Sequence, residues 1–140
     1  MKTTFKSTAR SFALAALLVG FAGTASAKIQ TMASPDTKEI AIGLNDVFVP
    51  GGFDSEADAY VVASGLFPNG CYSWKGASVK NVDAFNHEVQ SFATVSQGLC
   101  IMVLVPFNKE IRLGKLSTGT HNLKFLNGDG TFMQKTMTIE

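Results

Sequence analysis

The amino-acid sequence predicts an all-β fold, a single antiparallel β-sandwich of about seven or eight strands that follows a cleaved signal peptide. Two observations carry this fold class. Short apolar stretches recur along the chain, and clusters of Gly, Pro, Asn, Asp and Ser separate them, as is typical of strands joined by tight turns. No segment keeps a helical spacing of apolar residues for more than about two turns, so helices are expected to be minor.

The first 27 residues have the features of a secretory signal peptide. Lys2, Lys6 and Arg10 precede the apolar run SFALAALLVGFAG, which ends in the small residues TASA. The run is short and rich in Gly and Ala, whereas a membrane span needs about 20 predominantly apolar residues. We therefore expect cleavage after Ala27, a periplasmic or secreted mature chain, and no stable membrane insertion once the signal has been removed.

The chain that follows the signal peptide is long enough for one domain with its own core. We expect residues 28–36 to be a flexible N-terminal segment and residues 37–140 to form the β-sandwich. After cleavage, nine basic and eleven acidic residues remain, which gives a net charge of −2. Nucleic acid is not an expected partner, because phosphate binding needs a clustered basic surface that this chain lacks.

Two hairpins are predicted from turn residues. The turn PNG at 68–70 suits a short hairpin between AYVVASGLF and CYSW. Asn, Asp and two glycines at 127–130 suit a hairpin between the last two strands. In the first strand of that second hairpin, Leu123 and Phe125 alternate with more polar residues and are expected to face the core.

The stretch LCIMVLVPF, residues 99–107, is apolar almost throughout. Such a run is expected to form a central strand that is covered on both faces. Pro106 is expected to end the pairing of this strand, because proline brings no N–H to the hydrogen-bond ladder.

Cys71 and Cys100 are the only cysteines in the chain, and they lie 29 positions apart. Both are expected to reach a compartment that tolerates disulfides. A bridge between them would pin two strands across the core and contribute roughly 3 to 4 kcal/mol to stability by the chain-entropy estimate. We therefore predict an intramolecular disulfide, and the alternative is a pair of buried free thiols.

A catalytic role for Cys71 is the enzymatic alternative. The Gly-Cys dipeptide resembles part of the Ser-His-Gly-Cys motif of the L,D-transpeptidases that crosslink peptidoglycan. Here Asn69 stands at the histidine position, no arginine follows, and His87 comes 16 residues after the cysteine. A thiol without an adjacent base is a weak nucleophile at neutral pH. No phosphate loop, zinc-protease motif or serine nucleophile elbow is present, so we expect no enzyme activity, no catalytic residue and no cofactor.

Metal binding is the other alternative. The chain contains the ligand types of a blue-copper site, in His87, Cys100, Met102, His121 and Met133. In cupredoxins the cysteine, second histidine and methionine share one short loop, whereas two predicted strands separate Cys100 from His121. The alternating acids at 54–58 lack the glycine and the closing glutamate of an EF-hand. We expect no metal site, and a copper carrier or an irregular calcium site stays as the alternative.

Tyr72 and Trp74 follow the first cysteine closely. A tryptophan near a cysteine resembles immunoglobulin domains, although there the tryptophan comes roughly a dozen residues later, on the next strand. If Cys71 faces the core, strand alternation turns both aromatic residues outward. They are then a candidate contact surface, unless a flanking loop covers them.

The stretches LFPNGCY, CIMVLVPF and IRLGKLSTGTHNLKF resemble a recurrent type of exported bacterial β-sandwich, within about residues 60–126. The resemblance implies an immunoglobulin-like or fibronectin-like domain of unknown function, with no established activity. We therefore expect a small exported, non-catalytic module. It would bind an unknown protein, glycan or envelope component through its loops and an exposed edge.

Overall fold

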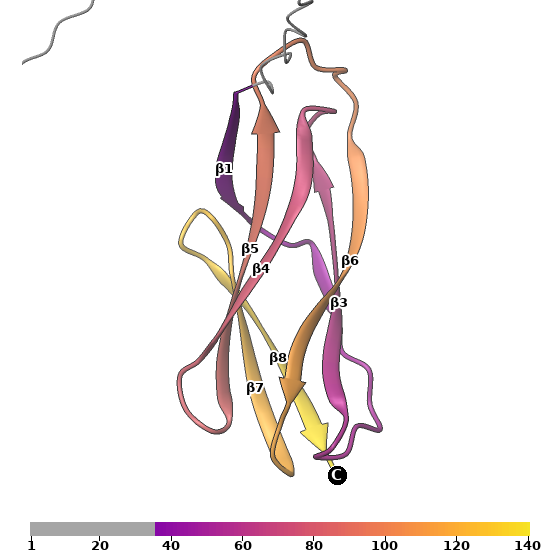
Figure 1. Ribbon diagram of the computed structural model, residues 1–140, viewed down its shortest axis with the longest axis vertical. Coiled ribbons are helices and arrows are strands. Elements are labelled where there is room, and N and C mark those ends of the chain that lie inside the picture. The colour runs from indigo at the N-terminus through magenta and orange to yellow at the C-terminus, as the bar shows by residue number, and fades with distance from the viewer. Residues whose placement is uncertain (1–35) are drawn as a thin grey trace, which may run out of the picture. The chain divides into compact units, whose positions relative to one another are not determined.

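The structure is a computed structural model that describes residues 36–140, which form eight strands in two sheets (Figure 1). The strands are β1 (Thr37–Ile42), β2 (Asp46–Phe48), β3 (Asp58–Phe67), β4 (Tyr72–Asn81), β5 (Asn86–Ser96), β6 (Val105–Lys115), β7 (Gly119–Leu126) and β8 (Phe132–Ile139). The predicted signal peptide and residues 28–35 lie outside the described residues. Within residues 36–140 no helix has the length and apolar character needed to cross a membrane.

The sheet topology confirms the predicted β-sandwich. One sheet has the order β4, β5, β7, β8, and β1 pairs with the part of β5 that β7 leaves free. The other sheet has the order β2, β3, β6. Strands β5 and β7 run parallel, which differs from the purely antiparallel pairing expected from the sequence; the other named pairs are antiparallel.

Alternation along the central strands forms the core between the two sheets. Every second residue is buried from 59 to 67 in β3, from 87 to 93 in β5 and from 121 to 125 in β7. Successive side chains of a strand point to opposite faces, so each of these strands turns one face inward. Leu123 and Phe125 are fully buried, as predicted.

The turn at 68–70 does not form the predicted hairpin. Strand β3 lies in one sheet and β4 in the other, so this turn carries the chain across the sandwich. The Gly70 N–H donates a hydrogen bond of 2.9 Å to the Ile101 carbonyl oxygen, which belongs to a different connection. The hairpin predicted at 127–130 is confirmed, because β7 and β8 pair along their full lengths.

The prediction of a central strand at 99–107 is wrong. Strand β6 begins only at Val105 and forms an edge of the three-stranded sheet. Pro106 lies opposite Leu66 inside the pairing instead of ending it. An edge strand tolerates proline because one row of its backbone groups faces no neighbouring strand.

Candidate contact surface

The connection between β5 and β6, residues 97–104, is called here the apolar loop. Large apolar side chains along it expose at least half of their surface, from 53% for Val103 to full exposure for Leu99, and the others are Ile101, Met102 and Leu104. No charged residue occurs between positions 97 and 108. A cluster of exposed apolar side chains on a folded domain marks an interaction site more often than an isolated one does.

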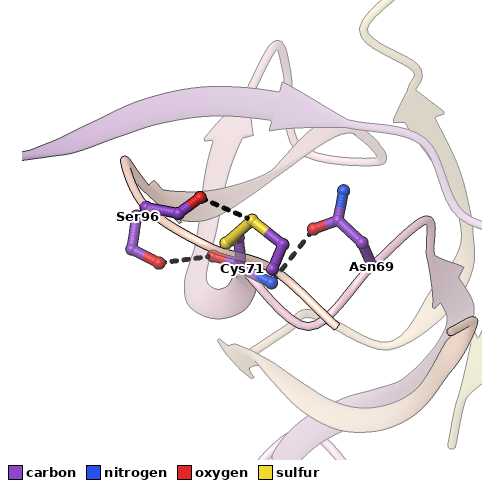
Figure 2. The surroundings of a disulfide bond; sticks show 5 residues. Asn69, Cys71 and Ser96 are labelled. Carbon is purple, nitrogen blue, oxygen red and sulfur yellow. Dashed lines mark hydrogen bonds between the residues drawn. A yellow bond between two sulfur atoms is a disulfide. The ribbon is translucent and has the colours of Figure 1, made fainter. Parts of the chain in front are cut away.

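A disulfide between Cys71 and Cys100 ties the apolar loop to the 68–70 turn. The two Cα atoms are 5.2 Å apart. Figure 2 shows Asn69 and Ser96 beside Cys71: the Asn69 Oδ1 accepts a 3.0 Å hydrogen bond from the Cys71 N–H, and the Ser96 N–H donates one of 3.0 Å to the Cys71 carbonyl. The predicted disulfide is thus present. However, it joins a turn and a loop at one end of the sandwich, and not two strands across the core.

Tyr72 and Trp74 do not form the outward-facing pair expected from strand alternation. Both side chains are half-buried and pack against the core. Tyr72 stacks on Phe67 with ring centroids 5.9 Å apart, and the Trp74 ring lies 5.4 Å from that of Phe107. The prediction failed because Cys71 precedes β4, so the alternation that starts at Tyr72 does not extend to the cysteine.

A groove of about 430 Å³ nevertheless leaves the aromatic residues accessible from one side. It lies between β4 and β6, the edge strands of the two sheets, and its apolar lining includes Phe67, Tyr72, Trp74 and Val105. Val105 directly follows the apolar loop, so the loop and the groove are continuous. The contact role predicted for Tyr72 and Trp74 stays a prediction, now as part of this groove.

The two histidines meet inside the domain. Both are buried, and Nε2 of His87 lies 2.9 Å from Nδ1 of His121. Nδ1 of His87 is 2.7 Å from the Asn81 Oδ1, and Nε2 of His121 is 2.7 Å from the Ser117 carbonyl oxygen. Burial and then the neighbouring His121 lower the pKa of His87, while the Asp83 carboxylate acts in the opposite direction. Sequence reasoning missed this pair, because nothing in the spacing of two lone histidines shows that β5 and β7 are neighbours.

The structure does not bring the other candidate ligands together. No group of three or more His, Cys, Asp or Glu in residues 36–140 is placed to hold a metal ion. The sulfur atoms of Cys71 and Cys100 are bonded to each other, so neither is a free thiolate. Met102 lies in the apolar loop, whereas His87 opens β5 at its other end. In the acidic stretch, Asp54 accepts hydrogen bonds from its own loop backbone.

Comparison with known proteins identifies one family. Residues 61–139 match the family described as ORF11 beta-sandwich domain. The matched segment runs from within β3 to the end of β8, so it includes the apolar loop and both sides of the groove. No curated protein and no solved structure matches the chain.

Proposed function

The chain belongs to the ORF11 beta-sandwich domain family, and on that premise we propose that it is a small exported module that binds a partner and catalyses no reaction. The partner is a protein, a glycan or another envelope component. The surface that contacts it consists of the apolar loop and the adjacent groove. The bacterial origin and immunoglobulin-like type belong to the same proposal and rest on the resemblance of residues 60–126.

The apolar loop is the observation that carries this proposal. Large apolar side chains that stay in water contribute little to folding, whereas burying each one fully is worth about 1.5 to 3 kcal/mol. Such exposure is typical of a binding surface. The disulfide and the hydrogen bond from Gly70 to Ile101 hold the loop to the neighbouring turn. A loop that is already ordered loses less conformational entropy when it binds.

Two features support export. The N-terminal sequence has the order of a signal peptide, with a basic start, an apolar run and a small-residue cleavage site. The disulfide between Cys71 and Cys100 fits the same location, because disulfides persist mainly in oxidising compartments. The mature protein is accordingly periplasmic or secreted.

Partner retention from an envelope extract tests the proposal. The wild type is compared with a double variant, Leu99→Ser/Met102→Ser, and with the control Val82→Ser. Val82 is 55% exposed and lies in the β4–β5 turn, at the opposite end of the sandwich. We expect the wild type and the control to retain the same partner and the double variant to lose it. All three should unfold within about 0.5 kcal/mol of one another, because the changed side chains are exposed.

If all three proteins retained the partner equally, the apolar loop would not be the contact surface. Turnover by the pure wild-type protein, or a stoichiometric bound metal, would instead favour the alternatives of a cysteine transpeptidase-like enzyme or a metal carrier.

A further inference from the structure

Polar side chains line a hollow on the outer face of the sheet that contains β5, β7 and β8. Asn86 of β5 lies opposite Asn122 of β7, and Glu88 lies opposite Lys124 one row further along. That second row continues to Gln134 of β8. These five side chains line a hollow of about 310 Å³. Figure 1 shows the turn before β5 and the connection after it at opposite ends of the domain, so the hollow is separate from the apolar loop.

The polar side chains of the hollow hold one another in place. The Asn122 Nδ2–H donates a 3.0 Å hydrogen bond to the Asn86 Oδ1. The Lys124 Nζ–H donates one of 3.3 Å to a carboxylate oxygen of Glu88. A carboxamide, an ammonium and a carboxylate can each make several hydrogen bonds, so these contacts use only part of their capacity. The hollow therefore offers ordered donors and acceptors side by side, which lowers the entropy that a ligand loses on binding.

The charges at the hollow favour an uncharged ligand. Glu88 and Lys124 form a half-buried ion pair, so their charges cancel. A charged ligand would have to displace one member of this pair from a partner already in place. An uncharged polar ligand can bond to both members without separating them, and charge complementarity across the contact is then kept.

A second hollow extends this surface around the edge of the sheet. Gln134 lines both hollows, and the second one, of about 670 Å³, lies between β2 and β8. Each hollow contains an exposed aromatic ring, Phe132 with 54% of its surface exposed and Phe48 with 65%. The second hollow also contains an ion pair, Lys135 with Asp46. Two hollows with the same chemistry fit a ligand of several repeating units.

A peptide strand added to the edge of β8 is the other extended ligand to consider. Natural sheets protect their edges against strand addition with lysine and with inward-pointing charges. Lys135 of β8 has both features, because its Nζ lies 3.0 Å from the Asp46 Oδ1 of β2, in the opposite sheet. This ion pair joins the two sheets at the edge along which an added strand would run, so the geometry disfavours a peptide strand.

From these observations we propose that the two hollows form a binding site for a neutral oligosaccharide. A sugar hydroxyl both donates and accepts hydrogen bonds, which matches the amides and the ion pairs of the hollows. The C–H face of a sugar ring is apolar and packs on an exposed aromatic ring such as Phe132 or Phe48. The site is distinct from the apolar loop and adds a second recognition surface to the function proposed above.

Nuclear magnetic resonance titration of the isotope-labelled exported protein tests this inference. The probes are cellotetraose, chitotetraose and maltotetraose, which are uncharged. We expect at least one of them to shift the amide signals of Asn122 and Gln134, with a Kd of roughly 1 mM or tighter, and to leave residues 97–104 unchanged. Because the ligand carries no charge, the Kd should change less than about twofold between about 50 and 500 mM salt.

A double variant and a matched control locate the site. Phe132→Ala/Gln134→Ala should bind the same sugar at least about tenfold more weakly. Thr138→Ala should bind as the wild type does, because Thr138 is exposed on the same face of β8 but does not line either hollow. The spectrum of each variant shows that it is folded. Leu99→Ser/Met102→Ser should also bind the sugar as the wild type does, which separates this site from the apolar loop.

Four results would overturn the inference. The first is that none of the three sugars shifts any signal at about 10 mM, and the second is an equal Kd for the double variant and the wild type. Shifts confined to residues 97–104 would instead place the sugar on the apolar loop. If the sugars cause no shift but the double variant loses a protein that the wild type retains from extract, the occupant of the hollows is a protein. Each of these results leaves the loss of a partner by Leu99→Ser/Met102→Ser to be judged separately.

Discussion

At the scale of single residues, the hydrogen bonds of the buried pair His87 and His121 determine which of their ring nitrogens carry protons. The Ser117 carbonyl only accepts, so Nε2 of His121 carries a proton. In a neutral pair, Nδ1 of His121 then accepts from Nε2 of His87, and the Asn81 amide nitrogen donates to Nδ1 of His87. The Asn81 Oδ1 lies 2.7 Å from Nδ1 of His87, and that oxygen could accept a hydrogen bond from Nδ1 only if the pair held a third proton. Protonation of the pair is therefore coupled to the orientation of Asn81.

Stability should fall as the pH decreases below about 6.5, the ordinary pKa of histidine. The folded pKa of His87 is lowered, mainly by burial, so the unfolded chain binds more protons between the two pKa values. The free energy of unfolding accordingly rises with pH in that window, by up to about 1.4 kcal/mol per pH unit for one proton. Urea unfolding from about pH 5 to pH 8 measures this slope.

His87→Gln is the matched variant for the pH series. Its overall stability is lower, because one buried hydrogen-bond partner changes, but the part of the slope that comes from His87 should disappear. An unchanged slope in His87→Gln would mean that other groups cause the pH dependence and that the pair contributes nothing to it.

At the scale of strands and loops, the sequence predicted the alternation of buried and exposed residues within a strand better than it predicted which strands pair. Leu123 and Phe125 are buried because an alternating pattern has one structural solution, a strand with one face inward. The apolar run at 99–107 has several structural solutions, because hydrophobicity alone does not show whether other parts of the chain cover the run. The PNG turn likewise specifies that the chain changes direction. Which sheet the next strand joins depends on contacts with residues far along the chain.

The disulfide should stabilise the domain without being needed for its strand pairing. Replacing both cysteines, Cys71→Ser/Cys100→Ser, is expected to lower the free energy of unfolding by roughly 3 to 4 kcal/mol, because a 29-residue closed loop is opened in the unfolded chain. Urea unfolding of the variant measures the loss, and reduced wild-type protein is the control. A variant as stable as the oxidised wild type would show that the bridge adds no stability.

At the scale of the whole molecule, charged side chains lie along the strands and at both ends of the domain. Ion pairs such as Lys135 with Asp46 and Lys115 with Glu56 lie on the strands and at the far end, well exposed to solvent. Exposed pairs of this kind contribute about 0 to 1 kcal/mol each, so they mark solvated faces more than they stabilise the fold. Through Cys71 and Trp74 the sequence pointed to the end of the domain that carries the apolar loop. It could not identify the exposed loop there, because exposure depends on how the two sheets pack.

Methionine oxidation tests most directly whether the apolar loop is an exposed surface that becomes covered on binding. Met102 in the loop is 81% exposed, whereas Met137 of β8 is 1% exposed and provides an internal control. With dilute peroxide and mass spectrometry, Met102 of the free protein should oxidise rapidly and Met137 slowly. After binding to isolated envelope material, Met102 should be protected while Met137 is unchanged. Slow oxidation of Met102 in the free protein, or an equal rate in the bound protein, would contradict the assignment of this loop as the contact surface.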